Sequence, residues 1–317
     1  MISIVLCLFL AAGNVFAGGS SQVAANPAPQ LPQPSEPVRS EVEIPEQQEV
    51  SRAEQVMKAL AAAYPRRIER VEFRDGDWAV LLRNTWYYYA GGKLLPENLL
   101  KDAAGYNPQP FYNYQSELPA WKEPDPQDAA RFRNMANNRS ANPPRRSPHF
   151  YDDLWRVHNR DESYQRVKSI RFLGKTVMVH YAILEDLSLV EERILDLAKT
   201  DPQVQSWINN IDMPDGWSWR NIADTQSRSF HAYGAAIDIL PKSLGGKETY
   251  WLWAAQKNLE WWNVSYNRRF HPPDAVIKAF ESYGFIWGGK WLFFDTMHFE
   301  YRPEILILSG MSLETLR

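Results

Sequence analysis

Residues 229–238, which read SFHAYGAAID, are the stretch that most constrains how this chain can fold. They place His231 and Asp238 on either side of Gly234 and two alanines, and such small residues let the backbone pack closely. The overlapping run at 235–240, AAIDIL, predicts a buried strand that carries a single acid. A carboxylate in an apolar strand is costly unless it is paired or bound to a metal. We therefore expect Asp238 to lie beside a cation.

A second cluster of candidate ligands lies at residues 295–300, which read DTMHFE. Two histidines and one aspartate are a sufficient protein ligand set for a catalytic zinc, with the fourth position left for water. His231, Asp238 and His298 are the predicted zinc ligands. Asp295 precedes His298 by three residues and is the candidate general base.

Arg220 precedes the first motif and is the candidate for neutralising the oxyanion that forms on a hydrolysed carbonyl. Bound zinc polarises its water and lowers the pKa of that water towards about 7. Together these residues predict metal-assisted amide hydrolysis. Spacing alone leaves open that each histidine is an ordinary structural residue, because the 38 acids of the chain produce acid–histidine pairs by chance.

The two motifs also resemble those of a known family. The pattern S-x-H-x-x-G-x-A-x-D at 229–238, followed by D-x-x-H-F-E at 295–300, is similar to the zinc D-Ala-D-Ala carboxypeptidase family of the VanY type, which also contains phage L-alanyl-D-glutamate endolysins. The resemblance covers about 168–305 and includes the run E-x-x-G-F-x-W-G-G-x-W at 281–291. Residues 51–150 carry no motif that we can place.

The resemblance assigns a role to each candidate residue. It implies that His231, Asp238 and His298 bind Zn²⁺. It also implies that Asp295 is the general base and that Arg220 steadies the substrate carbonyl. Many relatives have Glu at the position of the base, whereas this chain has the shorter Asp, as the endolysin-like branch does.

Two residues compete for these roles. Arg228 lies nearer to His231 in the sequence than Arg220 does, so it is the alternative arginine. Glu300 is the next candidate base after Asp295, and its other interpretation is a partner that orients a ligand histidine.

The fold implied by the resemblance is α+β, with the small antiparallel sheet and flanking helices shared with the Hedgehog signalling domain. The implied substrate is a peptidoglycan stem peptide, which agrees with an exported chain that is periplasmic or secreted. Carboxypeptidase and endopeptidase activities both stay open. A non-catalytic cell-wall-binding or scaffold protein on the same fold is the alternative from another class. Neither the motifs nor the composition predict the oligomeric state.

Composition divides the chain into four parts. Residues 1–17 predict a signal peptide, because a short apolar run ends in Val-Phe-Ala, with small residues where a signal peptidase reads. Residues 18–50 are rich in Pro and Gln and predict a disordered tether. Residues 51–149 predict an N-terminal aromatic-rich β extension, and 150–317 predict the zinc peptidase domain.

The overall charge and the single cysteine exclude several classes of function. A net charge of −3 gives no electrostatic reason to expect nucleic acid or an anionic membrane as a partner. Cys7 lies in the predicted leader, so the mature chain has no disulfides and no Cys-based zinc site. No segment beyond the leader approaches the length of a membrane span.

Local signals predict where several elements begin. Ser51 and Ser188 each start a capping box, which predicts the beginning of a helix. Asp201, followed by Pro, predicts an N-cap for a further helix. Residues 170–173 and 176–180 predict two strands that turn at Gly174-Lys175.

The remaining segments frame the motifs. Residues 217–220 predict a strand, and 249–262 predict a Trp-rich helix. Residues 285–287 and 298–301 predict the last strands. Residues 105–149, rich in Pro, Asn and Arg, predict a long and mostly irregular connection.

Overall fold

The computed structural model describes residues 46–257 and 260–314, which belong to one compact unit. The predicted signal peptide at 1–17 lies outside the described residues. So does the predicted tether, apart from its C-terminal end, which forms the start of helix α1 (Glu46–Ala63). This helix begins earlier than the start predicted at Ser51. Among the described residues, no helix combines the length and the apolar character needed to cross a bilayer.

A four-stranded antiparallel sheet in the order β7-β8-β10-β9 contains the C-terminal part of each sequence motif. Its strands are β7 (Ile211–Asp215), β8 (Ala236–Pro241), β9 (Phe285–Trp287) and β10 (His298–Tyr301). The buried strand predicted around Asp238 is confirmed as β8. In the register of the two middle strands, His298 lies directly opposite Asp238. The sheet therefore brings together two candidate ligands that are far apart in the chain.

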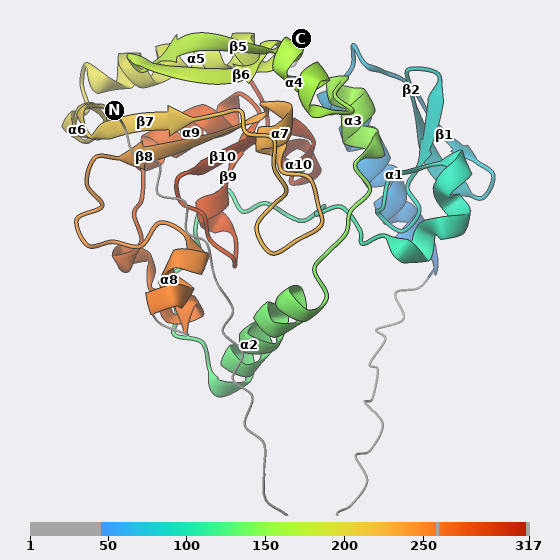
Figure 1. The fold of residues 1–317 in the computed structure, drawn as a ribbon, viewed down its shortest axis with the longest axis horizontal. Helices are drawn as coiled ribbons and strands as arrows, with labels where there is room; N and C mark the ends of the chain where they lie inside the picture. The colour runs from blue at the N-terminus through green and yellow to red at the C-terminus, as the bar shows by residue number, and fades with distance from the viewer. Residues whose placement is uncertain (1–45, 258–259, 315–317) are drawn as a thin grey trace, which may run out of the picture. The chain divides into compact units, whose positions relative to one another are not determined.

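A hairpin and three helices lie beside this sheet (Figure 1). They are β5 (Val167–Phe172), β6 (Lys175–His180), α5 (Leu184–Ala198), α6 (Pro202–Asn209) and α9 (Asp274–Ser282). Helix α5 buries Leu187, Val190 and Ile194 on one face and packs against α9. The hairpin and the Asp201 N-cap are confirmed, since Asp201 accepts hydrogen bonds from the first amides of α6.

The N-terminal part forms a second antiparallel sheet, in the order β1-β2-β3-β4. Its elements are β1 (Ile68–Arg74), β2 (Asp77–Leu82), β3 (Thr85–Tyr88), β4 (Leu95–Pro96) and the 3-10 helix η1 (Glu97–Gly105). Helix α1 lies between this sheet and α10 (Pro303–Leu308), which directly follows β10 (Figure 1). The apolar residues of the N-terminal part share one core cluster with those of the sheet that holds the motifs. The α+β class is thereby confirmed, with small antiparallel sheets and several helices.

The segment predicted to be mostly irregular contains one helix of 16 residues that the sequence analysis did not predict. Helix α2 (Pro126–Ala141) begins after Asp125, whose side chain accepts hydrogen bonds from the amides of Gln127 and Asp128. Its Phe132 packs against the aromatic cluster around Trp251. The other short helices are α3 (His149–Trp155), α4 (Arg160–Arg166), α7 (Phe230–Tyr233), α8 (Trp251–Lys257), η2 (Tyr181–Ile183), η3 (Trp261–Asn263), η4 (Tyr266–Arg268) and η5 (Gly288–Lys290).

Three local predictions were wrong. Ser188 lies inside α5, and Glu191 of the predicted capping box accepts a hydrogen bond from the amide of Leu173 instead. Residues 217–220, predicted to be a strand, are irregular, and the strand in this region is β7, which ends at Asp215. The Trp-rich helix predicted at 249–262 is shorter and is followed by a separate 3-10 turn.

A buried hydrogen bond joins the N-terminal part to helix α10, which follows the sheet that contains the motifs. Tyr64, which follows α1, donates to Glu304 Oε2 at 2.8 Å, and Glu304 is fully buried in α10. Arg302 and Tyr151 donate to the other carboxylate oxygen, Oε1. Among the described residues, Tyr64 is therefore the only hydrogen-bond donor to Glu304 Oε2. Burial and the Glu304 charge both raise the pKa of Tyr64 well above its ordinary value.

We expect Tyr64→Phe to lower the free energy of unfolding by about 1–3 kcal/mol, because it leaves a buried carboxylate oxygen without its donor. Tyr88→Phe is the matched control, since Tyr88 donates at 2.7 Å to Asp75, whose side chain is 64% exposed and can bond water instead. Urea unfolding of both variants measures the difference. Equal losses in the two variants would show that the Tyr64 bond does not join the two parts energetically.

Candidate metal centre and active site

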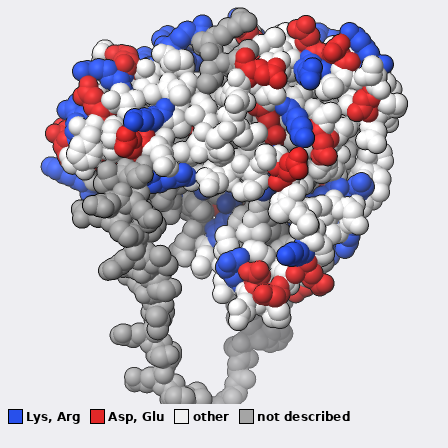
Figure 2. Space-filling view, turned by 180° about the vertical axis from the view of Figure 1, so that it is seen from behind, with Lys and Arg blue, Asp and Glu red and all other residues white. Residues whose placement is uncertain are grey.

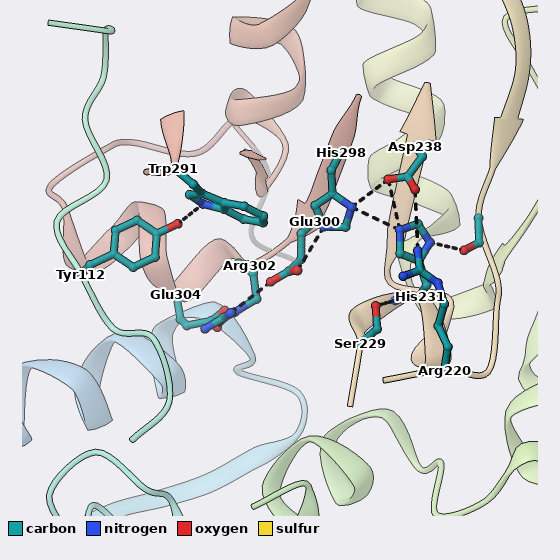
Figure 3. A network of polar contacts seen from close by, with 11 residues as sticks. Tyr112, Arg220, Ser229, His231, Asp238, Trp291, His298, Glu300, Arg302 and Glu304 are labelled. Atoms are coloured by element: carbon teal, nitrogen blue, oxygen red, sulfur yellow. Dashed lines mark hydrogen bonds and ion pairs between the residues drawn. The ribbon is translucent and has the colours of Figure 1, made fainter. Parts of the chain in front are cut away.

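The three predicted metal ligands lie together and are buried. One ligand atom from each of His231, Asp238 and His298 lies within 4.8 Å of the other two. Asp238 Oδ1 is 3.1 Å from His231 Nε2 and 2.8 Å from His298 Nδ1. The two ring nitrogens are 3.1 Å apart, and Figure 3 shows them pointing towards the same carboxylate. A set of two imidazoles and one carboxylate matches the ligands that catalytic zinc takes.

The turn between α7 and β8 places His231 next to Asp238. Ser229 caps α7 by accepting a hydrogen bond from the amide of His231 at 3.3 Å. Gly234 ends the helix in the left-handed region, at φ +68. A Cβ at Gly234 would lie 2.7 Å from Val167 Cγ1 and 2.8 Å from the amide nitrogen of His180. Only glycine therefore fits at position 234 of the motif.

Gly216 orients His231 from the loop after β7. Nδ1 of His231 donates to the carbonyl oxygen of Gly216, which leaves Nε2 to face Asp238 and His298. A Cβ at Gly216 would lie 2.1 Å from the carbonyl oxygen of Met178, so the close approach also requires glycine. Sequence reasoning missed Gly216, because a backbone acceptor leaves no mark in residue type or spacing.

His298 is held from its far side by a buried chain of charges. Its Nε2 lies 3.2 Å from Glu300 Oε2, and Glu300 accepts from Arg302, which also bonds Glu304 (Figure 3). His298 and Glu300 are two residues apart on β10, so both side chains point to the same face. Burial works to raise the pKa of Glu300, but His298 and Arg302 outweigh it and the pKa is lowered. Of the two interpretations of Glu300, this geometry favours the partner of a ligand histidine.

The electrostatics of the cluster suit a bound cation. Burial works to raise the pKa of Asp238, but the two histidines outweigh it and hold that pKa well below its ordinary value. Burial alone would lower the pKa of His298, yet its bonds to Asp238 and Glu300 raise it to about 10. The site therefore favours positive charge between these groups, and a divalent metal supplies such charge.

Asp295 lies in the turn before β10 and is set apart from the cluster. Its Oδ1 is buried and has no hydrogen-bond partner among the described residues. Burial raises the pKa of Asp295 to about 7, the Asp238 charge adds to this rise, and His298 and Arg220 oppose it. A carboxyl group with a pKa near neutrality, facing the same cavity as His298, suits proton transfer.

The structure separates the two candidate arginines. Arg220 Nη2 lies 3.8 Å from Asp238 Oδ2, and its side chain is 43% exposed. Arg228 instead pairs with buried Asp152 and lies 4.6 Å from the ring centre of Trp219. Both arginines line the cavity, but only Arg220 reaches the candidate ligands. Arg220 comes from the irregular segment after β7 rather than from the predicted strand.

A cavity of about 290 Å³ opens beside the cluster and is lined by His231, His298, Asp295 and Arg220. Part of its wall comes from the chain before the motifs, between residues 109 and 148. Tyr112 of this wall accepts a hydrogen bond at 2.6 Å from Trp291 Nε1 (Figure 3). Sequence reasoning assigned this segment no role in the site.

Comparison with family models gives two partial matches. Residues 223–301, about a quarter of the chain, match a family described as D-alanyl-D-alanine carboxypeptidase. This match contains all three candidate metal ligands and Asp295, and it supports a hydrolase of the metallopeptidase type. Residues 56–111 match a family described as a domain of unknown function. Comparisons with curated proteins and with solved structures gave no match.

Proposed function

We propose that this protein is a zinc peptidase that hydrolyses an amide bond in peptidoglycan stem peptides. The observation that carries the proposal is the convergence of His231, Asp238 and His298 beside a cavity that Asp295 also lines. The hydrolysed bond is that of a D-Ala-D-Ala carboxypeptidase or of an L-Ala-D-Glu-type endopeptidase. The proposal also includes the family type and the fold. We propose that the protein is of the VanY or the endolysin type and that its motif-bearing sheet has the Hedgehog-like core.

The protein residues divide the work of hydrolysis. His231, Asp238 and His298 would hold Zn²⁺, which when bound supplies a Lewis acid that makes water nucleophilic near neutral pH. Asp295 takes a proton from the attacking water and passes it to the leaving amine. Arg220 donates hydrogen bonds to the negative charge that develops on the carbonyl oxygen.

The proposed substrate sets where the protein acts. Peptidoglycan lies outside the cytoplasm, so we propose a periplasmic or secreted protein, exported by the signal peptide at 1–17. Residues 150–317 are the proposed peptidase domain, and 51–149 contribute to the cavity wall.

Figure 2 shows Lys and Arg interspersed with Asp and Glu on the face drawn there.

Purified protein is expected to contain close to one zinc per chain, and His231→Ala or His298→Ala to lose it. Each variant removes one of three ligands, and the two remaining side chains do not complete a zinc site. Elemental analysis after gel filtration measures the metal, with His158→Ala as the control because His158 lies outside the cluster and bonds Asp153 and Glu162. Full zinc content in both ligand variants would remove this site from the proposal.

Digestion of purified peptidoglycan, with mass analysis of the fragments, tests the reaction itself. Loss of a terminal D-Ala identifies a carboxypeptidase, and cleavage between L-Ala and D-Glu identifies an endopeptidase. Binding of peptidoglycan without any released fragment, by zinc-loaded protein, would instead support the non-catalytic wall-binding alternative.

A further inference from the structure

The cavity beside the metal cluster is unusually rich in arginine. Five arginines line it, whereas Asp295 and Glu300 are its only lining acids among the described residues. The arginines are Arg139, Arg146, Arg220, Arg228 and Arg302. The face drawn in Figure 2 is hollowed, and blue Lys or Arg atoms are visible inside the hollow. An excess of cations in a small cavity favours an anionic ligand.

Three of these arginines already have carboxylate neighbours. Arg228 pairs with Asp152, Arg302 pairs with Glu300 and Glu304, and Arg220 lies 3.8 Å from Asp238. The charges of these three are paired with protein carboxylates, although Arg302 Nη2 is buried without an acceptor among the described residues, so the unpaired charge comes from the other two.

Among the described residues, the side chains of Arg139 and Arg146 have only backbone carbonyls as hydrogen-bond acceptors. Arg139 donates to the carbonyl of Ala223 at 3.0 Å, and Arg146 donates through Nε to the carbonyl of Pro108 at 3.1 Å. Within the described part of the chain, neither forms an ion pair with a carboxylate, and Arg139 Nε is buried without any acceptor. Both side chains therefore keep donors that no protein acid uses.

Burial makes these two cations costly. It lowers the pKa of Arg139 and of Arg146, and the charges of Arg139 and Arg302 lower the pKa of Arg146 further. The charge of Asp224 opposes this shift at Arg139, and that of Glu300 opposes it at Arg146. Partly buried like charges without a directly paired carboxylate destabilise a fold, and a bound carboxylate would relieve that cost through paired hydrogen bonds.

The position of the pair limits where the anion can lie. Arg139 lies in α2 and Arg146 in the segment after it, yet both face the cavity that His231, His298 and Asp295 line. At about 290 Å³, this cavity holds only a few residues of a peptide. A carboxylate bound there therefore lies close to the hydrolysed amide.

We propose that Arg139 and Arg146 bind a carboxylate of the substrate, so that the enzyme prefers peptides with a free carboxylate next to the hydrolysed bond. This inference rests on the proposed function and names its substrate class. Both arginines lie outside the residues that match the carboxypeptidase family, so this specificity comes from the preceding part of the chain. The carboxylate has two sources in stem peptides, a C-terminal D-Ala and the α-carboxylate of γ-linked D-Glu.

Two pairs of synthetic peptides separate the sources. One pair is L-Lys-D-Ala-D-Ala with a C-terminal acid or amide, and the other is L-Ala-γ-D-Glu-L-Lys with a free or amidated Glu α-carboxylate. We expect the full chain to favour the acid of one pair by about 10–100-fold in kcat/KM, the scale of a charged hydrogen-bonded contact. Arg146→Gln should bring this ratio to within about threefold by slowing the acid alone. Arg145→Gln is the matched control, because Arg145 is exposed and lies 4.9 Å from the ring centre of Tyr106, outside the cavity.

Equal hydrolysis of acid and amide by the wild type, or equal slowing of both by Arg146→Gln, would overturn the inference. If no peptide is hydrolysed, the proposed function fails and calorimetry with the Asp295→Ala protein decides the inference separately. Tighter binding of an acid than of its amide, lost on adding Arg146→Gln, would support a carboxylate site. Equal binding, or no detectable binding of either, would rule it out.

Discussion

Asp295→Ala is expected to keep its zinc and to lose hydrolysis by about 100-fold or more, the usual scale for a general base. The side chain lines the cavity but lies outside the group of atoms that could hold the metal. Its buried Oδ1 has no hydrogen-bond partner among the described residues, although the backbone of Met297 hydrogen-bonds the carboxyl group and lowers its pKa. Loss of activity with an unchanged metal content would therefore report on proton transfer.

A stability measurement separates this role from a structural one. The pKa of Asp295, raised to about 7, means that folding disfavours its ionised form. This cost is absent below the ordinary pKa near 4, grows between about pH 4 and 7, and is complete above the folded pKa. Metal-free Asp295→Ala should therefore gain stability over the wild type at pH 8 and not at pH 4.

Near-normal turnover of Asp295→Ala would move the base to another residue. Glu300 would be next, although it already contacts His298 and Arg302. Asp196→Ala is the control, because Asp196 is exposed on α5 and pairs with Lys199 at the surface.

Arg220→Ala is expected to raise the barrier to hydrolysis by about 3–4 kcal/mol, the usual cost of losing an oxyanion donor. That corresponds to a loss of roughly 100- to 1,000-fold in kcat. Arg220→Lys should also be impaired, because it keeps the charge but loses the planar fork of donors. Steady-state hydrolysis of a stem peptide measures both variants, and stability should change little because the Arg220 side chain is 43% exposed.

Arg228→Ala should show the opposite pattern. It leaves buried Asp152 without its guanidinium partner, so we expect a loss of stability that exceeds any loss of turnover per folded molecule. Urea unfolding alongside kinetics distinguishes the two arginines. Normal turnover in Arg220→Ala with collapse in Arg228→Ala would mean that the two roles are exchanged.

Local sequence patterns were sufficient to predict those elements whose formation depends mainly on residues close together in the chain. The apolar run around Asp238 predicts β8, and Asp201 followed by Pro predicts α6, as found. Asp125 followed by Pro is the same signal for α2, but the surrounding Pro, Asn and Arg residues outweighed it in the prediction. Helix α2 packs its apolar residues on the Trp251 cluster, a contact between distant segments.

Tertiary contacts overrode local preference elsewhere. β7 reads IDMPD and has a weak strand pattern, yet it pairs with β8, whereas the aromatic run at 217–220 is irregular. Ser188 has the residues of a capping box, but α5 already begins at Leu184 after the turn η2, so Ser188 lies within the helix. Where a strand forms or a helix ends depends on which segments pack against it in the fold, and residue type alone does not predict those segments.

The candidate site shows the same division. The sequence by itself determined which side chains are available as ligands, because His231, Asp238 and His298 stand in motifs whose residue types and spacing are specific. Only the tertiary structure decided what surrounds them. The Gly216 carbonyl that orients His231 and the Arg146 side chain that faces the same cavity come from segments that no motif connects. Backbone acceptors and charges from distant segments meet through packing, and packing is a property of the whole fold rather than of any local pattern.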